Sequence, residues 1–314
     1  MRVLVAGATG VIGNRLVPLL TSVGHDVVAL VRSSGRVADT ERTGAQAVVA
    51  NLLDRSAVLR AVDESKPDAI VHMATAIPHE INPRKMTRDF AVTNRLRVEG
   101  TRNLVEAAER ARVRRLVTQG VAFAYQPTGQ GPANEDTPFW PNPPRQFVLV
   151  LDAVREMERL TAQANGLVLR FGHLYGPGSV YAADGSFVRQ VRAGKVPIVG
   201  KGTGTFSFTH AHDAASAVVA ALDKDATGAF NVVDDEPAEL REWLPGLARI
   251  LGAREPRHLP MALVRLAAGG WGAAFLGRLR GADNARARLA LDWRPRYSSW
   301  REGFVAELGG GSTG

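Results

Sequence analysis

The first thirteen residues, MRVLVAGATGVIG (1–13), decide how the rest of the chain is interpreted. A strand-length apolar run passes directly into a turn that contains Gly7, Gly10 and Gly13. Glycines in such a turn let the backbone fold tightly and approach a pyrophosphate, which would rest on the N-terminus of a helix expected from Val11. Glycine-rich turns are common, but a glycine triplet directly after the first strand predicts a dinucleotide-binding site.

Five further apolar runs of strand length follow the first. They cover residues 26–31, 45–50, 68–74, 114–120 and 167–172. The stretches between them, such as 89–111 and 147–164, carry apolar residues at helical spacing. Near-continuous apolar strands joined by helices predict an α/β fold with a doubly wound parallel Rossmann sheet.

The pattern loosens after about residue 172, which predicts a second and smaller unit. We expect a nucleotide-binding Rossmann domain over residues 1–171, completed by segments near 209–235. Residues 172–308 would form an interleaved, mostly helical C-terminal cap that binds the substrate. The final residues 309–314, GGGSTG, are expected to be a disordered tail.

Composition excludes several classes of site and partner. The chain contains no cysteine, which excludes disulfides, cysteine metal sites and thiol nucleophiles, and no ligand spacing predicts a metal. The net charge of +8 comes from dispersed arginines, often beside Asp or Glu, which favours a solvated surface over a nucleic-acid interface. No secretion signal opens the chain, and its longest apolar stretch (261–277) is interrupted by Arg265 and by glycines. We expect a cytoplasmic monomer or homodimer without nucleic-acid or membrane partners.

Further stretches carry a resemblance to a known family. They are NLLD (51–54), VHMA (71–74), TNRLRVEGTRNLVEAA (93–108), RFGHLYGPG (170–178), THAHDAASA (209–217) and FNVVDDEP (230–237). With the G-x-x-G-x-x-G spacing of residues 7–13, they resemble the extended branch of the short-chain dehydrogenase/reductase superfamily, the NAD(P)-dependent epimerase/dehydratase-like proteins. The resemblance covers nearly the whole chain and implies an NAD(P)-dependent oxidoreductase.

The resemblance also implies where the cofactor would lie. Leu53 and Asp54 would lie near the adenine, and Phe171 and His173 beside the nicotinamide. A structural role at the carboxyl end of the sheet explains Asn94 at least as well as a catalytic one. The complete set of expected cofactor residues is Gly7, Thr9, Gly10, Val11, Ile12, Gly13, Arg32, Ser33, Leu53, Asp54, Met73, Ala74, Thr75, Thr118, Phe171 and His173.

The residues after the second strand favour NADP(H) over NAD(H). NAD enzymes place an acidic residue there to bind the ribose hydroxyls. This chain has Arg32, Ser33 and Ser34, with Arg36 close by. A guanidinium and hydroxyls suit a 2′-phosphate, which a carboxylate would repel. The alternative is that Arg32 only stacks on the adenine, which leaves NAD(H) open.

The family's catalytic serine or threonine and its Tyr-x-x-x-Lys pair have no counterpart in this sequence. Tyrosine and lysine four residues apart share one helical face, where the lysine charge lowers the tyrosine pKa. Aligned through the neighbouring motifs, these positions fall on Val121, Val150 and Val154. None of the five lysines has a tyrosine four residues before it. We therefore interpret the chain as an atypical member: another group supplies the proton, the reaction needs none, or no reaction occurs.

Few residues could replace the missing acid. Tyr125 is the first choice and His173 the second, while Gln119, at the tip of the fifth strand, could hold a carbonyl oxygen. Tyr125 and His173 each have a structural role as the alternative to a catalytic one. Tyr125 would pack against the cap, and His173 would only hydrogen-bond to the backbone. His79 and Glu80 would face the same crevice, although a solvated charge explains Glu80 better.

The expected substrate pocket is largely apolar. Nucleotide-sugar members of the family carry an arginine that binds the diphosphate, at or next to the position of Phe206 in this chain. An aromatic ring cannot pair with a diphosphate but can cover an apolar ring, unless Phe206 packs in the cap core. The expected substrate-lining residues are His79, Val121, Phe123, Val150, Tyr175 and Phe206.

Three functions follow from this pattern. The leading one is an NADP(H)-dependent reductase that acts on a small apolar or aromatic/polycyclic carbonyl or enone with a non-standard proton donor; secondary metabolism is one setting for such a substrate. The second is a non-redox isomerase or cyclase that retains the nucleotide as a scaffold. The third is a nucleotide-sensing binding protein without turnover.

Overall fold

A seven-stranded parallel sheet forms the centre of the computed structural model, which describes residues 1–309. Its strands run in the order β11-β6-β5-β4-β1-β2-β3. They are β1 (Arg2–Ala6), β2 (Asp26–Val31), β3 (Gln46–Val49), β4 (Ala69–His72), β5 (Arg115–Val121), β6 (Leu167–Phe171) and β11 (Gly228–Val232). The chain reverses its direction of travel across the sheet between β3 and β4, so the carboxyl ends of β1 and β4 meet at the switch point of a doubly wound Rossmann fold.

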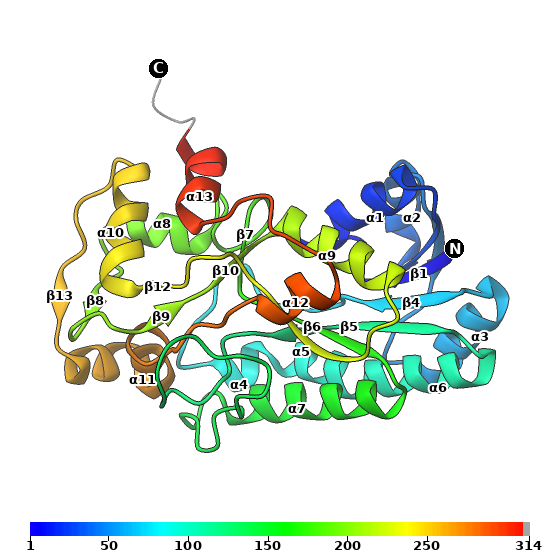
Figure 1. The fold of residues 1–314 in the computed structure, drawn as a ribbon, viewed down its shortest axis with the longest axis horizontal. Helices are drawn as coiled ribbons and strands as arrows, with labels where there is room; N and C mark the ends of the chain where they lie inside the picture. The colour runs from blue at the N-terminus through cyan, green and yellow to red at the C-terminus, as the bar shows by residue number, and fades with distance from the viewer. Residues whose placement is uncertain (310–314) are drawn as a thin grey trace.

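Helices cover both faces of the sheet (Figure 1). Helices α1 (Gly13–Ser22) and α9 (Ala211–Asp223) pack together on one face, and α3 (Arg55–Ser65), α6 (Thr101–Ala111) and α7 (Val148–Gln163) lie on the other. Strands buried on both sides need apolar residues at every position, not at alternate ones. The near-continuous apolar runs of the sequence have this cause, and the expected fold class is confirmed.

The alternation of side chains along β1 shows how the two cores are built. Val3 and Val5 belong to the core beneath α1 and α9, whereas Leu4 and Ala6 belong to the core beneath α3 and α6. All four side chains are fully buried. Successive residues of a strand point to opposite faces, so this short segment joins both cores.

The stretch 89–111, expected as one helix, is divided in the structure. It contains α5 (Ala91–Arg95), a π-helical turn over Leu96–Gly100, and α6; α4 (Met86–Asp89) precedes them. The π-helical turn brings the Leu96 carbonyl within 3.2 Å of Nε2 of His72, at the end of β4. A single extra residue per turn leaves the hydrophobic period nearly unchanged, which is why the sequence pattern did not reveal it.

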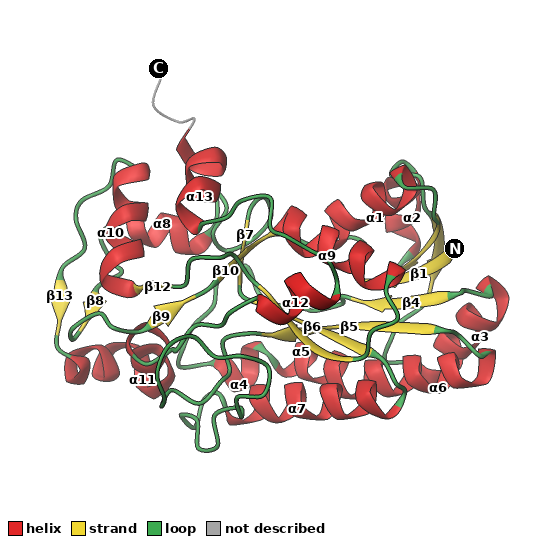
Figure 2. Cartoon of the chain, viewed as in Figure 1, coloured by secondary structure: helices red, strands yellow, loops and turns green. Residues whose placement is uncertain are grey.

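The remaining elements complete the Rossmann part and form a second core beside it (Figure 2). A short 3-10 turn (Ser34–Arg36) and α2 (Val37–Glu41) follow β2, and α12 (Ala285–Ala290) packs on the sheet near β11. The elements of the second core are β7 (His173–Tyr175), α8 (Ser186–Arg192), β8 (Ile198–Val199), β9 (Thr205–Phe206), β10 (Phe208–His210), β12 (Ala238–Glu239), α10 (Leu240–Ile250), β13 (His258–Leu259), α11 (Met261–Gly277) and α13 (Trp300–Leu308). We call this group the cap; its core is aromatic, with Trp243, Trp300 and Phe304 fully buried.

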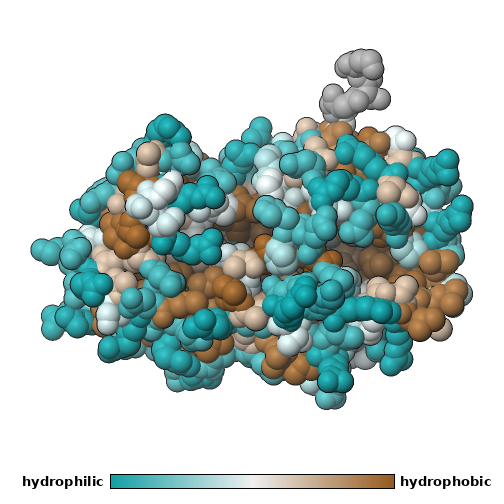
Figure 3. Space-filling view, turned by 180° about the vertical axis from the view of Figure 1, so that it is seen from behind, coloured by the Kyte–Doolittle hydropathy of each residue, from teal (hydrophilic) through white to brown (hydrophobic). Residues whose placement is uncertain are grey.

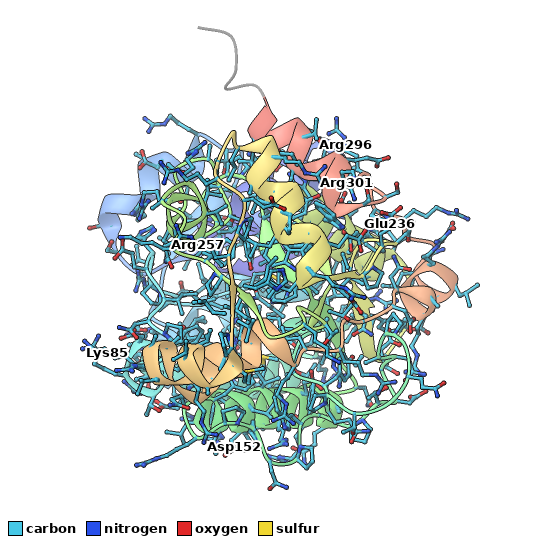
Figure 4. The ribbon with its side chains drawn as sticks, turned by 90° about the vertical axis from the view of Figure 1, so that its left-hand side faces the viewer. Lys85, Asp152, Glu236, Arg257, Arg296 and Arg301 are labelled. Atoms are coloured by element: carbon cyan, nitrogen blue, oxygen red, sulfur yellow. The ribbon has the colours of Figure 1, made fainter. Side chains whose placement is uncertain are left out.

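The surface is mostly polar. In Figure 3, hydrophilic residues cover most of the visible face and hydrophobic ones gather in its hollowed parts. Figure 4 shows charged side chains at the periphery, among them Asp152 of α7, which pairs with Arg155 at 3.0 Å. No helix within residues 1–309 is both long and apolar enough to span a membrane. Residues 310–314, most of the expected tail, lie outside the described part of the chain.

The glycine turn should be intolerant of a methyl group. Gly7 has φ +93, and a Cβ there would lie 2.6 Å from the Ala74 amide nitrogen. Gly7→Ala should therefore lower the free energy of unfolding by more than the ~1–2 kcal/mol of left-handed strain alone, as measured by urea denaturation. Gly24→Ala is the matched control, because Gly24 has φ +86 but nothing within 4 Å of a Cβ. Equal losses in the two variants would contradict the close contact.

Candidate cofactor and active site

The glycine turn and the loop after β4 are packed backbone against backbone. A Cβ on Gly7 would lie 2.6 Å from both the Met73 carbonyl carbon and the Ala74 nitrogen, and one on Gly13 would lie 2.2 Å from the Gly7 oxygen. The Gly10 amide donates to the Gly7 carbonyl at 3.0 Å. The structure thus brings together the three glycines and the loop residues expected to bind the cofactor.

The start of α1 fits an anionic ligand. The helix begins at Gly13, two residues later than expected, and no side chain caps it. Its first turn contains no acidic residue, so the amides at this end face no negative charge from that turn. Val11 lies beside Gly178 of the RFGHLYGPG stretch, 3.9 Å from where its Cβ would be. The glycine turn adds no bulky side chains here, so this end of α1 suits the pyrophosphate of a dinucleotide.

The residues expected around the adenosine follow β2 and precede α3. Arg32 and Ser33 are exposed directly after β2, and Arg36 is exposed in the following turn. Asp54 caps α3 by accepting a hydrogen bond from the Ala57 amide at 3.0 Å. Capping α3 is a structural role for Asp54. The guanidiniums of Arg32 and Arg36, in contrast, have no ion-pair partner among residues 1–309 and are available to a ligand.

His72 fixes the loop after β4, a role that the sequence reasoning missed. Its Nδ1 accepts a hydrogen bond from the Ala74 amide at 3.4 Å, and its Nε2 lies 3.2 Å from the Leu96 carbonyl. Burial lowers the pKa of His72 to about 4, so the ring is neutral and Nε2–H donates to that carbonyl. The sequence does carry a signal for this role, because His72 is the polar last residue of the otherwise apolar strand β4.

An apolar wall contains the three valines that were expected at the family's catalytic positions. Val121 at the end of β5 and Val150 and Val154 on α7 belong to one buried cluster of apolar side chains. Helix α11 covers this cluster through Trp271, whose ring stacks on Phe147 with centroids 3.8 Å apart and planes 2° apart. We call this cluster the valine wall.

His173 lies between the sheet and the cap, inside a group of aromatic rings. Its ring centroid is 4.9 Å from that of Phe123, 4.6 Å from Phe206 and 5.2 Å from Phe275. Nδ1 donates to the Ser207 carbonyl at 3.1 Å, which leaves Nε2 with a lone pair, buried and without a partner among residues 1–309. Burial lowers the pKa of His173 to about 4, so the ring is a neutral hydrogen-bond acceptor.

Tyr125 is held in a polar network rather than aimed at the valine wall. Its hydroxyl donates to Oδ1 of Asn231 at 2.6 Å and accepts from Nη1 of Arg170 at 2.9 Å. Arg170 in turn pairs with Glu158 at 2.6 Å. Burial raises the pKa of Tyr125 to about 12. Because the proton and a lone pair are both engaged, the structure supports the packing alternative for Tyr125.

Other expected site residues also have structural partners. The Thr118 hydroxyl lies 3.0 Å from that of Thr161 on α7, and both side chains are fully buried. Phe206 is fully buried between His173 and Trp243 in the cap core, and Tyr175 packs beside Phe304. For Phe206 the structure therefore supports the core alternative. Phe171 is buried in the core beneath α1 and α9, and Gln119 is only half-buried on β5.

A surface hollow of about 460 Å³ opens between the loop after β4, α8 and α11. Its lining begins at Glu80, which pairs with Arg189 of α8 at 3.0 Å. The preceding residue, His79, is exposed. Lys85, visible at the edge of Figure 4, belongs to the hollow. Its lining residues are Glu80, Ile81, Asn82, Pro83, Lys85, Arg88, Asp89, Gln190, Ala267 and Ala268. The hollow is polar at its mouth and reaches the apolar surface of α11.

Comparison with known proteins matches the sequence to one family. The model of the NAD dependent epimerase/dehydratase family matches residues 3–233. The chain belongs to this family. A 3-diazoavenalumate denitrifying reductase from a Streptomyces species is 48% identical over 98% of this chain and 100% of its own length. A 4-hydroxy-2-methyl-3-oxo-4-farnesyl-3,4-dihydroquinoline-1-oxide ketoreductase from Stigmatella aurantiaca is 27% identical over 85% of this chain and 79% of its own.

Among solved structures, the UDP-glucose 4-epimerase of Thermotoga maritima, with UDP-glucose, superposes with a TM-score of 0.77 at 20% identity. The alignment covers 98% of this chain and 97% of the epimerase. Identity this low shows the shared fold. The expected membership of the epimerase/dehydratase family, with its Rossmann sheet, is confirmed.

Replacing Tyr125 tests whether it donates a proton or holds the fold. Tyr125→Phe keeps the ring but leaves Asn231 and Arg170 short of a buried partner, so we expect a loss of about 1–3 kcal/mol in the free energy of unfolding. Tyr297→Phe, at a half-buried position outside this network, should cost under about 0.5 kcal/mol. A fall in turnover of about 100-fold with unchanged stability would instead make Tyr125 the proton donor.

Proposed function

We propose that this family member is an NADP(H)-dependent reductase that transfers hydride to a small, apolar aromatic substrate, and that the substrate is a diazo carboxylate. The valine wall carries this proposal. Its apolar side chains would stand where other family members protonate a substrate oxygen, so a reaction that consumes no proton suits it best. The 48% identical relative supports the substrate class.

The charges at the rim support NADP(H). A 2′-phosphate would meet exposed Arg32, Ser33 and Arg36, and β2 ends without an acidic residue. The nearest acid in the following segment, Asp39, is already paired with Arg42. The glycine turn and the start of α1 would hold the pyrophosphate, and the bound nicotinamide would supply the hydride.

Hydride transfer to an aryl diazonium group balances without an acid. The hydride forms a new C–H bond at the ring carbon, the C–N bond breaks, and its electron pair leaves with dinitrogen. The positive charge of the diazonium is cancelled, so no proton is taken up. The valine wall would exclude water from such a step and so protect the reactive group from hydrolysis.

The aromatic group around His173 supports an aromatic substrate. Phe123 and Phe275 are only partly buried and flank the His173 ring. Aromatic faces of this kind attract both planar rings and cations. The unpartnered Nε2 would accept a hydrogen bond from a hydroxyl on the substrate ring.

Carbonyl or enone reduction is the second candidate. The 27% identical ketoreductase favours it. It requires a proton on the reduced oxygen, which the neutral His173 would have to relay from water. The two reactions therefore differ in whether solvent hydrogen enters the product.

The reaction test uses NADPH deuterated at nicotinamide C4 and a diazotised aminocinnamate. We expect dinitrogen release, consumption of one NADPH per product, and deuterium on the former diazo carbon, measured by mass spectrometry. Unlabelled NADPH in D2O is the control and should leave that carbon unlabelled. Reduction of an aromatic ketone panel, with no diazo turnover, would favour the second candidate. Product without NADPH consumption would indicate an isomerase or cyclase, and NADPH binding without any turnover a sensor; both would exclude the proposal.

The cofactor preference has its own test. Arg32→Asp replaces the guanidinium with a carboxylate that repels the 2′-phosphate, so NADPH binding should weaken by about 1.5–3 kcal/mol and NADH binding should change little. Calorimetry with both nucleotides measures the ratio. Arg257→Asp, an exposed change directly before β13 in the cap, controls for net charge. An unchanged ratio in Arg32→Asp would remove Arg32 from the cofactor site.

A further inference from the structure

Arg97 is a buried cation without a counter-ion. It lies in the π-helical turn and is only 4% exposed. Its Nη1 is buried and has no hydrogen-bond partner, and within residues 1–309 the guanidinium belongs to no ion pair. The other buried arginine of the described chain, Arg170, has Glu158 and Tyr125 as partners. Arg97 thus has a cost of burial that no side chain offsets.

Two other side chains with unpartnered atoms share its helical face. Asn94 and Thr101 are three residues before and four after Arg97, and each has a buried oxygen without a partner in the described part of the chain. At this spacing all three lie on one side of the helix. The Thr101 hydroxyl can donate, and a half-turn of the Asn94 amide presents its nitrogen instead of its oxygen. The face therefore offers a charge and up to three donors.

The π-helical turn that carries Arg97 lies beside the candidate site. The π-helical turn packs against α7, the helix that carries Val150 and Val154. In the same turn, a Cβ on Gly100 would lie 3.9 Å from Nε2 of His72, and the Arg97 charge is close enough to lower the pKa of His72. His72 in turn holds the loop that packs on the glycine turn. The turn that carries Arg97 therefore contacts both the histidine that holds the loop after β4 and the helix that carries two of the valines.

We propose that Arg97 binds an oxyanion of the ligand at the carboxyl end of β4, either a phosphate of the dinucleotide or the carboxylate of the substrate. An ordered water could satisfy Nη1, but it would not neutralise the charge. A bound oxyanion would do both, and bidentate pairing suits the planar guanidinium. The substrate source rests on the proposed function, whereas the dinucleotide source needs only the family's cofactor.

The test compares Arg97→Met, which keeps the apolar stem, with Arg97→Lys, which keeps the charge. The matched control is Arg102→Met on the next turn, where the arginine is exposed. Calorimetry uses NADPH, 2′,5′-ADP and 4-hydroxycinnamate as probes. We expect Arg97→Met to weaken either NADPH or hydroxycinnamate by about 10- to 100-fold, Arg97→Lys to weaken it less, and Arg102→Met to bind like wild type.

The probes separate the two sources. Weaker NADPH with unchanged hydroxycinnamate assigns the cofactor, and unchanged 2′,5′-ADP then places the contact on the nicotinamide half. Weaker hydroxycinnamate alone, with no effect on its amide, assigns the substrate carboxylate. Binding of both probes within threefold of wild type in Arg97→Met would overturn the proposal.

Thermal unfolding without ligand supplies a readout that does not depend on the proposed reaction. Removing an uncompensated buried charge should raise the Tm of Arg97→Met above that of wild type. If the wild-type protein binds neither NADPH nor hydroxycinnamate, the proposed reductase fails, and the Tm decides on Arg97. A lower Tm would then show that the chain itself satisfies the guanidinium and would overturn the oxyanion site.

Discussion

The close approach of two backbone segments at the carboxyl edge of the sheet is the constraint on which the site depends. Only a residue without Cβ at position 7 lets the turn after β1 lie against Ala74. The Ala74 amide is held by His72, and His72 is held by the Leu96 carbonyl. The π-helical turn supplies that carbonyl. The glycine turn, the loop after β4 and the π-helical turn therefore form one chain of contacts.

The two buried arginines show how the protein distributes its polar groups. Arg170 joins α7, β6 and Tyr125 into a satisfied network, which stiffens the sheet edge. Arg97 has no such partners, although it is buried as deeply. An unpaired buried charge is a net cost to the fold unless a ligand pairs with it, and this cost is the ground for proposing a ligand at Arg97.

The sequence predicted the sheet because its signals are local. The run 26–31 matches β2 residue for residue, and the other runs match their strands to within two residues. The roles of side chains were harder to predict because they depend on remote partners. Tyr125 was ambiguous until Asn231, 106 positions later, proved to accept its proton. Neither the π-helical turn nor the burial of Arg97 changes the spacing of the apolar residues. An arginine on a helix with many polar residues is therefore predicted to be exposed to solvent.

The valine wall would favour some reactions over others according to how the charge of the substrate changes in the transition state. Ketone reduction builds negative charge on oxygen, and an apolar wall without a donor opposes that charge in the transition state. Reduction of a diazonium removes positive charge as the hydride arrives. A dry environment destabilises the charged ground state more than the partly neutralised transition state, which lowers the barrier. The partly buried rings of Phe123 and Phe275 would offset the cost of admitting the cation, through their π faces. Under the proposed function, the absence of an acid would select the reaction, because an acid would stabilise a negative charge that hydride transfer to a diazonium does not form.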